Sequence, residues 1–137
     1  MIAYVDSSVV LRIVLEQPQP LRELGRYELV TSELTRIECL RAVDNALVRR
    51  EIDEDEALLR RGAVFQKVKN AHRVALSRSI MERAAGGFAT QLGTLDALHV
   101  ATALLWRDGR TADLVFATHD RQQARAARAL GFEVLGA

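Results

Sequence analysis

Four carboxylates stand where acids could carry out metal chemistry. Asp6 and Asp120 each follow an apolar run and precede a helix-like stretch, in "IAYVDSS" and "LVFATHDR". Asp96 stands in front of an apolar run that ends at Trp106, and Glu38 has apolar neighbours in "SELTRIECLRA". Clustered carboxylates repel one another unless a cation neutralises them. Because Mg²⁺ and Mn²⁺ prefer oxygen ligands and activate water, the acids predict a metal site that hydrolyses a phosphate ester.

Each acid also has a simpler interpretation. Asp6 and Asp120 could only cap the helices that follow them. Asp96 could interact with the dipole of a first helical turn, and Glu38 could form a surface ion pair with Arg41. The apolar run behind Asp96 weakens its simpler interpretation, because a buried carboxylate needs a compensating partner.

Strands and helices that alternate along the chain must position these acids. Apolar and β-branched runs predict strands at 2–5, 28–32, 72–77, 112–118 and 132–135. Helical patterns, caps and prolines predict helices at 7–17, 21–27, 33–50 (capped by Thr31 or Ser32), after Asp53, at 79–87, from Thr94 to Trp106 (capped by Thr94) and at 121–130. This order implies a parallel sheet with helices on both faces. Ligands bind outside the carboxyl ends of such strands, where Asp6 and Asp120 are expected.

The composition indicates a globular protein. The 137 residues are 49% hydrophobic and 27% charged, which favours one domain over residues 1–137. A net charge of +1 gives no overall basic field, and Cys39, the only cysteine, excludes a disulfide or a cysteine-based zinc site within one chain. With no apolar stretch of membrane-spanning length and no basic, signal-like start, a cytoplasmic location without membrane contact is expected.

Four segments resemble, in order, the motif regions of PIN-domain proteins. They are "YVDSSVV", "SELTRIECLRA", "TLDALHVATAL" and "FATHDRQQARAARALGFEV". The resemblance covers essentially the whole chain, although 51–90 matches only in length and helical character. It implies an α/β fold, a PIN-like three-layer α/β/α sandwich with a short central parallel sheet of four to five strands. The size is similar to that of the VapC toxins of bacterial toxin–antitoxin pairs.

The resemblance also implies an activity. Such proteins are Mg²⁺- or Mn²⁺-dependent endoribonucleases, and the matching catalytic acids here are Asp6, Glu38, Asp96 and Asp120. Asp6 and Asp96 would hold the principal ion, with Glu38 and Asp120 as secondary ligands. Two hydroxyls, from Ser8 and Thr118, would support them. The arginines considered for RNA phosphates are Arg12, Arg41 and Arg121.

The resemblance implies partners as well. A VapB-like antitoxin is expected to place a basic tail residue in the acidic pocket, where a guanidinium can bridge two carboxylates. A homodimer and an RNA substrate are also expected. Transfer, ribosomal and messenger RNA all stay open as targets.

Other interpretations compete with this one. The chain could be a non-catalytic PIN-fold module that binds RNA or protein, or an aspartate-based phosphotransfer domain. Ser8 disfavours an aspartate phosphohydrolase, which would carry a second Asp there. The two lysines lie in a predicted helix, which disfavours a phospho-accepting receiver domain, because such a domain needs a lysine after a strand. His99, one turn after Asp96, could be a general base, but a partly buried residue bonded to a neighbour is the favoured interpretation. His119 is expected to be exposed.

Overall fold

The computed structural model describes residues 1–110 and 113–137, which form a five-stranded parallel sheet of order β3-β2-β1-β4-β5. The strands are β1 (Ile2–Val5), β2 (Glu28–Ser32), β3 (His72–Val74), β4 (Leu114–Ala117) and β5 (Val134–Leu135). β1 lies at the centre, where Ala3 aligns with Leu29 of β2 and Val115 of β4. The predicted parallel sheet is therefore confirmed.

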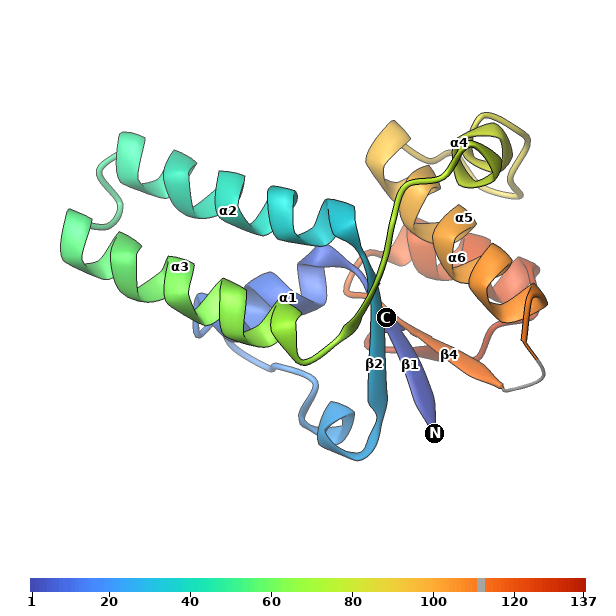
Figure 1. The fold of residues 1–137 in the computed structure, drawn as a ribbon, viewed down its shortest axis with the longest axis horizontal. Helices are drawn as coiled ribbons and strands as arrows, with labels where there is room; N and C mark the ends of the chain where they lie inside the picture. The colour runs from blue at the N-terminus through green and yellow to red at the C-terminus, as the bar shows by residue number, and fades with distance from the viewer. Residues whose placement is uncertain (111–112) are drawn as a thin grey trace.

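Helices cover both faces of the sheet (Figure 1). They are α1 (Ser7–Val14), the 3₁₀-helix η1 (Arg22–Arg26), α2 (Glu33–Val48), α3 (Glu54–Lys69), α4 (Arg78–Ala84), α5 (Thr94–Asp108) and α6 (Arg121–Ala129). α1, α2 and α3 lie on one side, and α4, α5 and α6 lie on the other. α2 and α3 run side by side as a hairpin that projects beyond the sheet. The arrangement confirms the three-layer α/β/α sandwich.

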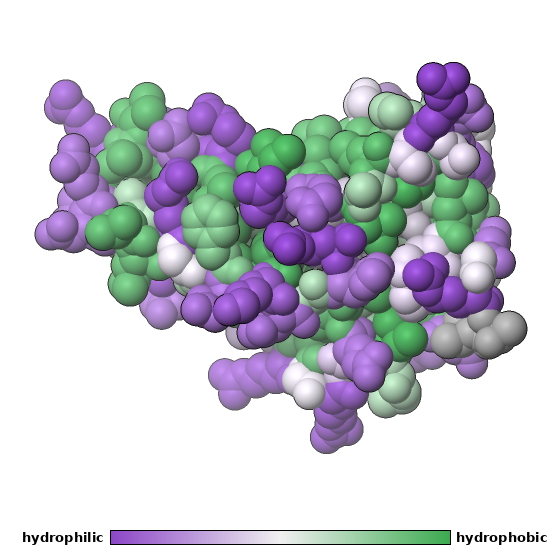
Figure 2. Space-filling model, viewed as in Figure 1, coloured by the Kyte–Doolittle hydropathy of each residue, from purple (hydrophilic) through white to green (hydrophobic). Residues whose placement is uncertain are grey.

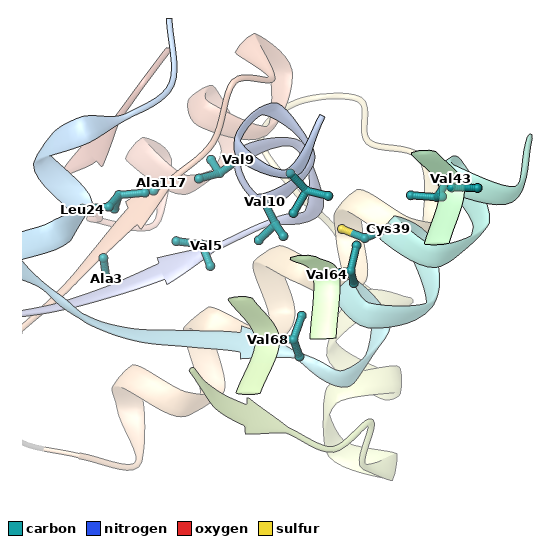
Figure 3. Close-up of a cluster of buried hydrophobic side chains, with 12 residues drawn as sticks. Ala3, Val5, Val9, Val10, Leu24, Cys39, Val43, Val64, Val68 and Ala117 are labelled. Carbon is teal, nitrogen blue, oxygen red and sulfur yellow. The ribbon is translucent and has the colours of Figure 1, made fainter. Parts of the chain in front are cut away.

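Two apolar cores hold β1 in place, because successive side chains of a strand point to opposite faces. Ala3 and Val5 pack with Val9 of α1 and with residues of α2 and α3 (Figure 3). Tyr4 packs into the other core and stacks on Phe116 of β4, with ring centroids 5.2 Å apart. The residue that follows β1 is thereby placed by packing on both faces of the sheet.

Several predicted boundaries in the first half were too long. The helix predicted at 7–17 ends at Val14, and Glu16 and Gln19 take positive φ values of 52° and 58° beside the two prolines. The stretch predicted as a helix at 21–27 is a 3₁₀-helix. Asp53 caps α3 as predicted, because its side chain accepts a hydrogen bond from the amide of Glu56.

The second half shows similar differences. The strand predicted at 72–77 ends at Val74, and the helix predicted at 79–87 spans Arg78–Ala84. The strand predicted at 112–118 is described from Leu114 to Ala117, and Ala112 lies outside the described residues. The strand predicted at 132–135 is limited to its last two residues. Over the described ranges, no helix has both the length and the apolar character needed to cross a bilayer.

The predicted cap of α5 was wrong. Thr94 is the first residue of the helix rather than its cap, and Gly93 occupies the N-cap position without a side-chain hydrogen bond. The helix also runs two residues past Trp106, to Asp108. The start of α5 is instead tied down by contacts from α6, which belong to the site.

Candidate active site at the carboxyl edge of the sheet

Asp6 and Asp120 come together because β1 and β4 are neighbours and both strands end at the same edge. Each aspartate is the N-cap of the next helix. Asp6 Oδ1 accepts the amide of Val9 at 3.1 Å, and Asp120 Oδ1 accepts the amide of Gln123 at 2.8 Å. The N-cap interpretation is confirmed for both residues. Because the backbone caps use only Oδ1, capping leaves Oδ2 of each residue open to other contacts.

Asp6 is almost fully buried, at 2% exposed. Its Oδ1 also accepts the hydroxyl of Ser8 at 2.6 Å, and its Oδ2 lies 2.5 Å from the hydroxyl of Thr118. Burial raises the pKa of Asp6, although these two hydroxyls act in the opposite direction. The structure therefore places Ser8 and Thr118 against the acid that they were expected to support.

Two kinds of covalent chemistry fit these surroundings poorly. A phosphate-accepting aspartate must expose an oxygen to a bulky phosphoryl group, whereas Asp6 is only 2% exposed. Cys39 is fully buried, and burial raises the pKa of its thiol to about 12, so it stays protonated near neutral pH. Neither residue is placed as a nucleophile.

Asp96 lies in the first turn of α5, half-buried, and faces the combined charge of the other acids. Burial raises the pKa of Asp96 most, and the carboxylates of Asp120, Asp6 and Glu38 raise it further. The neighbouring His99 acts in the opposite direction. Within residues 1–110 and 113–137 the Asp96 side chain has no hydrogen bond or ion pair. The four predicted acids thus lie within electrostatic range of one another.

Glu38 reaches this site from α2, with its side chain 17% exposed. His99 Nε2 lies 2.5 Å from Glu38 Oε1. The alternative pairing with Arg41 is wrong, because Arg41 forms its ion pair with Asp44 at 2.8 Å. His99 is bonded to a neighbour as interpreted, but it is fully rather than partly buried, at 1% exposed.

Gln123 is a site residue that was not predicted. It is fully buried in the first turn of α6. Its Nε2 donates to the backbone carbonyl of Asp96 at 3.2 Å, and its Oε1 lies 3.0 Å from the hydroxyl of Thr118. The spacing of Asp120 and Gln123 matches a capping box, in which Gln occurs three residues after the cap. That spacing is the signal by which the sequence could have indicated this residue.

The three candidate arginines differ in their positions. Arg41 is exposed and already paired with Asp44. Arg121 is exposed at the first position of α6, next to Asp120. Arg12 lies close enough to His119 to lower the pKa of that histidine, although burial lowers it more. His119 is half-buried, so the expectation that it is exposed was wrong.

The chemistry of the four carboxylates suits a divalent cation better than their present arrangement does. Among the described residues, no three His, Cys, Asp or Glu side chains form a ready-made metal site. The donors are carboxylate oxygens, as Mg²⁺ and Mn²⁺ prefer. Over residues 1–110 and 113–137, no Arg or Lys is among the main influences on the pKa of Asp6 or Asp96. A bound cation would supply positive charge to offset these carboxylates.

Exposed apolar side chains gather at a distance from the acids, on the α2–α3 hairpin. Val48, Leu58, Leu59 and Phe65 are 48–73% exposed. A groove of about 860 Å³ between α1 and α3 is lined by Ile13, Val14, Leu58 and Leu59 together with polar residues. Figure 2 shows apolar surface over this hairpin. None of the four acids lines the groove.

Comparisons with known proteins agree on one family and one fold. The PIN domain family model matches residues 3–129. FitAcB from Neisseria gonorrhoeae is 17% identical with a TM-score of 0.69, covering 98% of this chain and 96% of that chain. VapBC2 from Rickettsia felis, bound to a DNA fragment from their promoter, is 11% identical with a TM-score of 0.66, covering 98% and 97%. A toxin–antitoxin complex from Klebsiella pneumoniae is 17% identical with a TM-score of 0.56, covering 88% of each chain. No curated protein matched the sequence.

Proposed function

The chain belongs to the PIN-domain family, and from this premise we propose that it is the toxin of a VapBC-like toxin–antitoxin pair. In this proposal it is a Mg²⁺- or Mn²⁺-dependent endoribonuclease that hydrolyses RNA phosphodiester bonds and leaves a 3′-hydroxyl and a 5′-phosphate. The similar structures from Neisseria gonorrhoeae, Rickettsia felis and Klebsiella pneumoniae support the proposal through their fold. It acts as one domain, in the cytoplasm, where its RNA would be found.

The charge around Asp96 is the observation that carries this proposal. An acid at the start of an apolar helix would ordinarily be exposed or paired. Asp96 is instead half-buried, unpaired within the described residues, and close to three other carboxylates that raise its pKa. A cluster that costs free energy in the metal-free protein is expected where a cation binds.

The residues then have distinct roles. Asp6 and Asp96 would hold the principal ion, and Glu38 and Asp120 would complete the cluster or position water. When bound, the ion would lower the pKa of a water molecule and offset charge on the phosphate. Ser8 and Thr118 keep the Asp6 carboxylate in one orientation through the bonds already described. Arg12 and Arg121 are the better-placed arginines for RNA phosphates, because Arg41 is engaged by Asp44.

Cleavage of RNA by matched variants tests the proposal. The purified protein is incubated with total RNA in Mg²⁺, in Mn²⁺ and in EDTA, and the new 5′ ends are sequenced. Asp96→Asn is expected to abolish cleavage. Asp108→Asn, at the exposed far end of the same helix, is the control and is expected to cleave normally. Cleavage by Asp96→Asn equal to that of the parent protein would show that the site is wrongly assigned. Metal binding without cleavage of any RNA would favour the non-catalytic module.

An antitoxin is the partner that we propose for this chain. A basic residue of its tail would enter the acidic pocket, where a guanidinium can bridge two carboxylates. The body of the antitoxin would cover apolar side chains of the hairpin, which include Leu58, Leu59 and Phe65. A second copy of the chain is proposed as a further partner, and light scattering at several concentrations measures that association.

A further inference from the structure

A buried chain of hydrogen bonds joins three layers of the fold and ends at Glu38. Tyr4 of β1 is 0% exposed, and its hydroxyl lies 2.7 Å from His99 Nδ1. His99 of α5 is 1% exposed, and its Nε2 lies 2.5 Å from Glu38 Oε1. These contacts span 95 and 61 residues of sequence. Both nitrogens of the imidazole are therefore committed, and neither is free to act on a substrate.

The direction of these bonds follows from the tyrosine. Burial holds the pKa of Tyr4 well above its ordinary value, so the hydroxyl keeps its proton. That proton can be donated to His99 Nδ1, which lies 2.7 Å away. The opposite ring nitrogen, Nε2, then faces Glu38 Oε1 and can donate its proton to that oxygen.

We propose that Tyr4 and His99 are positioning residues for Glu38: their chain fixes Oε1 and leaves Oε2 as the oxygen that serves a divalent cation or its water. The inference rests on the proposed function, because it gives Glu38 a role at the acidic site. A free glutamate on a helix samples several rotamers, whereas this one is held from inside the protein. Partners that orient a ligand in this way typically contribute about 10- to 100-fold to metal affinity or activity.

Substitutions of His99 separate positioning from simple packing. In His99→Gln, the amide Nε2 can still donate to Glu38 and the amide oxygen can accept from Tyr4. In His99→Leu, the volume is largely kept but both bonds are lost. Mn²⁺ affinity, measured by electron paramagnetic resonance of the free ion, is expected to fall about 10- to 100-fold in the Leu variant. The Gln variant is expected to recover most of it, and kcat should follow the same order while KM for RNA stays constant.

Two further variants complete the design. Tyr4→Phe is expected to weaken Mn²⁺ binding in the parent protein but to add no further loss in His99→Leu, because the two residues act through one chain. Thr35→Val is the control. Thr35 is buried on α2 one turn before Glu38, and its hydroxyl bonds to Thr31 rather than to the site. Its Mn²⁺ affinity should equal that of the parent.

The outcomes distinguish this inference from the proposed function. If the parent protein binds no Mn²⁺ and Glu38→Gln changes nothing, the proposed function fails. Suppose that the parent binds Mn²⁺ and that Glu38→Gln lowers this affinity. A Mn²⁺ affinity of His99→Leu equal to that of the parent then overturns the positioning role. Equal losses in His99→Leu and His99→Gln also overturn it. Nitrogen NMR of the metal-free parent gives a test that needs no variant to fold: a proton on Nε2 is expected, and an unprotonated Nε2 overturns the donation to Glu38.

Discussion

The Gln123 side chain donates a hydrogen bond to the backbone carbonyl of Asp96 at 3.2 Å and so ties the start of α6 to the first turn of α5. The same amide group contacts the Thr118 hydroxyl at the end of β4 through its oxygen. A single buried residue therefore sets the spacing between the segments that carry Asp96 and Asp120.

Gln123→Leu is expected to loosen this spacing. The substitution keeps most of the volume but removes two hydrogen bonds, to Thr118 and to the Asp96 carbonyl, each of which contributes about 0.5–1.5 kcal/mol. Urea unfolding measures the stability, and Mn²⁺ titration measures the site, where affinity should fall. Gln122→Leu, at the exposed neighbouring position, is the control and should change neither quantity. Normal Mn²⁺ affinity in Gln123→Leu would show that the spacing does not depend on this amide.

Asp6→Asn should leave the metal-free fold intact while cleavage is lost. The amide oxygen can replace Oδ1 as the cap of α1. The amide nitrogen can donate to the Thr118 oxygen, which frees the single hydroxyl proton of Thr118 for Gln123 Oε1, 3.0 Å away. Asp6→Ala removes the cap and should destabilise the fold by about 0.5–2 kcal/mol. Thermal unfolding in EDTA compares the two variants. If Asn were as damaging as Ala, the carboxylate itself would be a structural requirement.

The folding stability of the metal-free protein should depend on pH through the titration of Asp96. Its pKa is raised in the folded protein above the ordinary 3.8, so the fold binds more protons than the unfolded chain in the window above that value. Stability contributed by this group is therefore lost as pH rises through the window. Asp96→Asn removes the effect, and its melting temperature should exceed that of the parent by about 2–4 °C at neutral pH but not in acid. Asp108→Asn should show no such pH dependence.

Divalent cations should stabilise the folded protein. An ion that binds only the native state adds about 2.7 kcal/mol when it is present at a hundredfold excess over its Kd. The melting temperature should therefore rise with Mg²⁺ or Mn²⁺ in the parent and much less in Asp96→Asn. NaCl at matched ionic strength is the control for general screening. An equal rise in both proteins would place the ion elsewhere.

Inhibition by the antitoxin should weaken as magnesium rises, because the ion and the guanidinium compete for one pocket. Replacing the basic tail residue of the antitoxin with Ala should restore RNA cleavage while the complex still forms. Cleavage assays across a magnesium series, with complex formation followed by size-exclusion chromatography, measure both effects. Full inhibition by the Ala variant at every magnesium concentration would rule out occupation of the acidic site.

The meeting of Asp6 and Asp120 at one edge of the sheet was predictable, because it depends on local signals in the sequence. Asp6 and Asp120 each follow a short apolar run, and parallel topology brings the ends of such runs to one edge. Their capping role was equally visible, because an N-cap is defined by the residues next to it. In the sequence, capping and metal binding look like alternatives for each aspartate, whereas in the structure each cap uses only one carboxylate oxygen.

The contacts between distant segments were not predictable in the same way. The chain from Tyr4 through His99 to Glu38 joins residues 95 and 61 positions apart, and no local pattern encodes such pairs. Gln123 lies in a helix whose other residues are mostly Arg and Ala, so its burial follows only from packing against β4 and α5. Thr94 looked like a cap by residue type, but the backbone places Gly93 at that position.

The central position of β1 has a consequence for synthesis of the protein. This strand is made before its neighbours in the sheet, yet one of them is β4, and the contact between Asp6 and Thr118 spans 112 residues. A nascent chain that has completed α2 contains Asp6 and Glu38 but lacks Asp96 and Asp120. Stalled or truncated translation products that stop before β4 therefore contain only part of the acidic cluster. In the proposed toxin, nuclease activity at this site would therefore begin only after β4 and Asp120 have been translated.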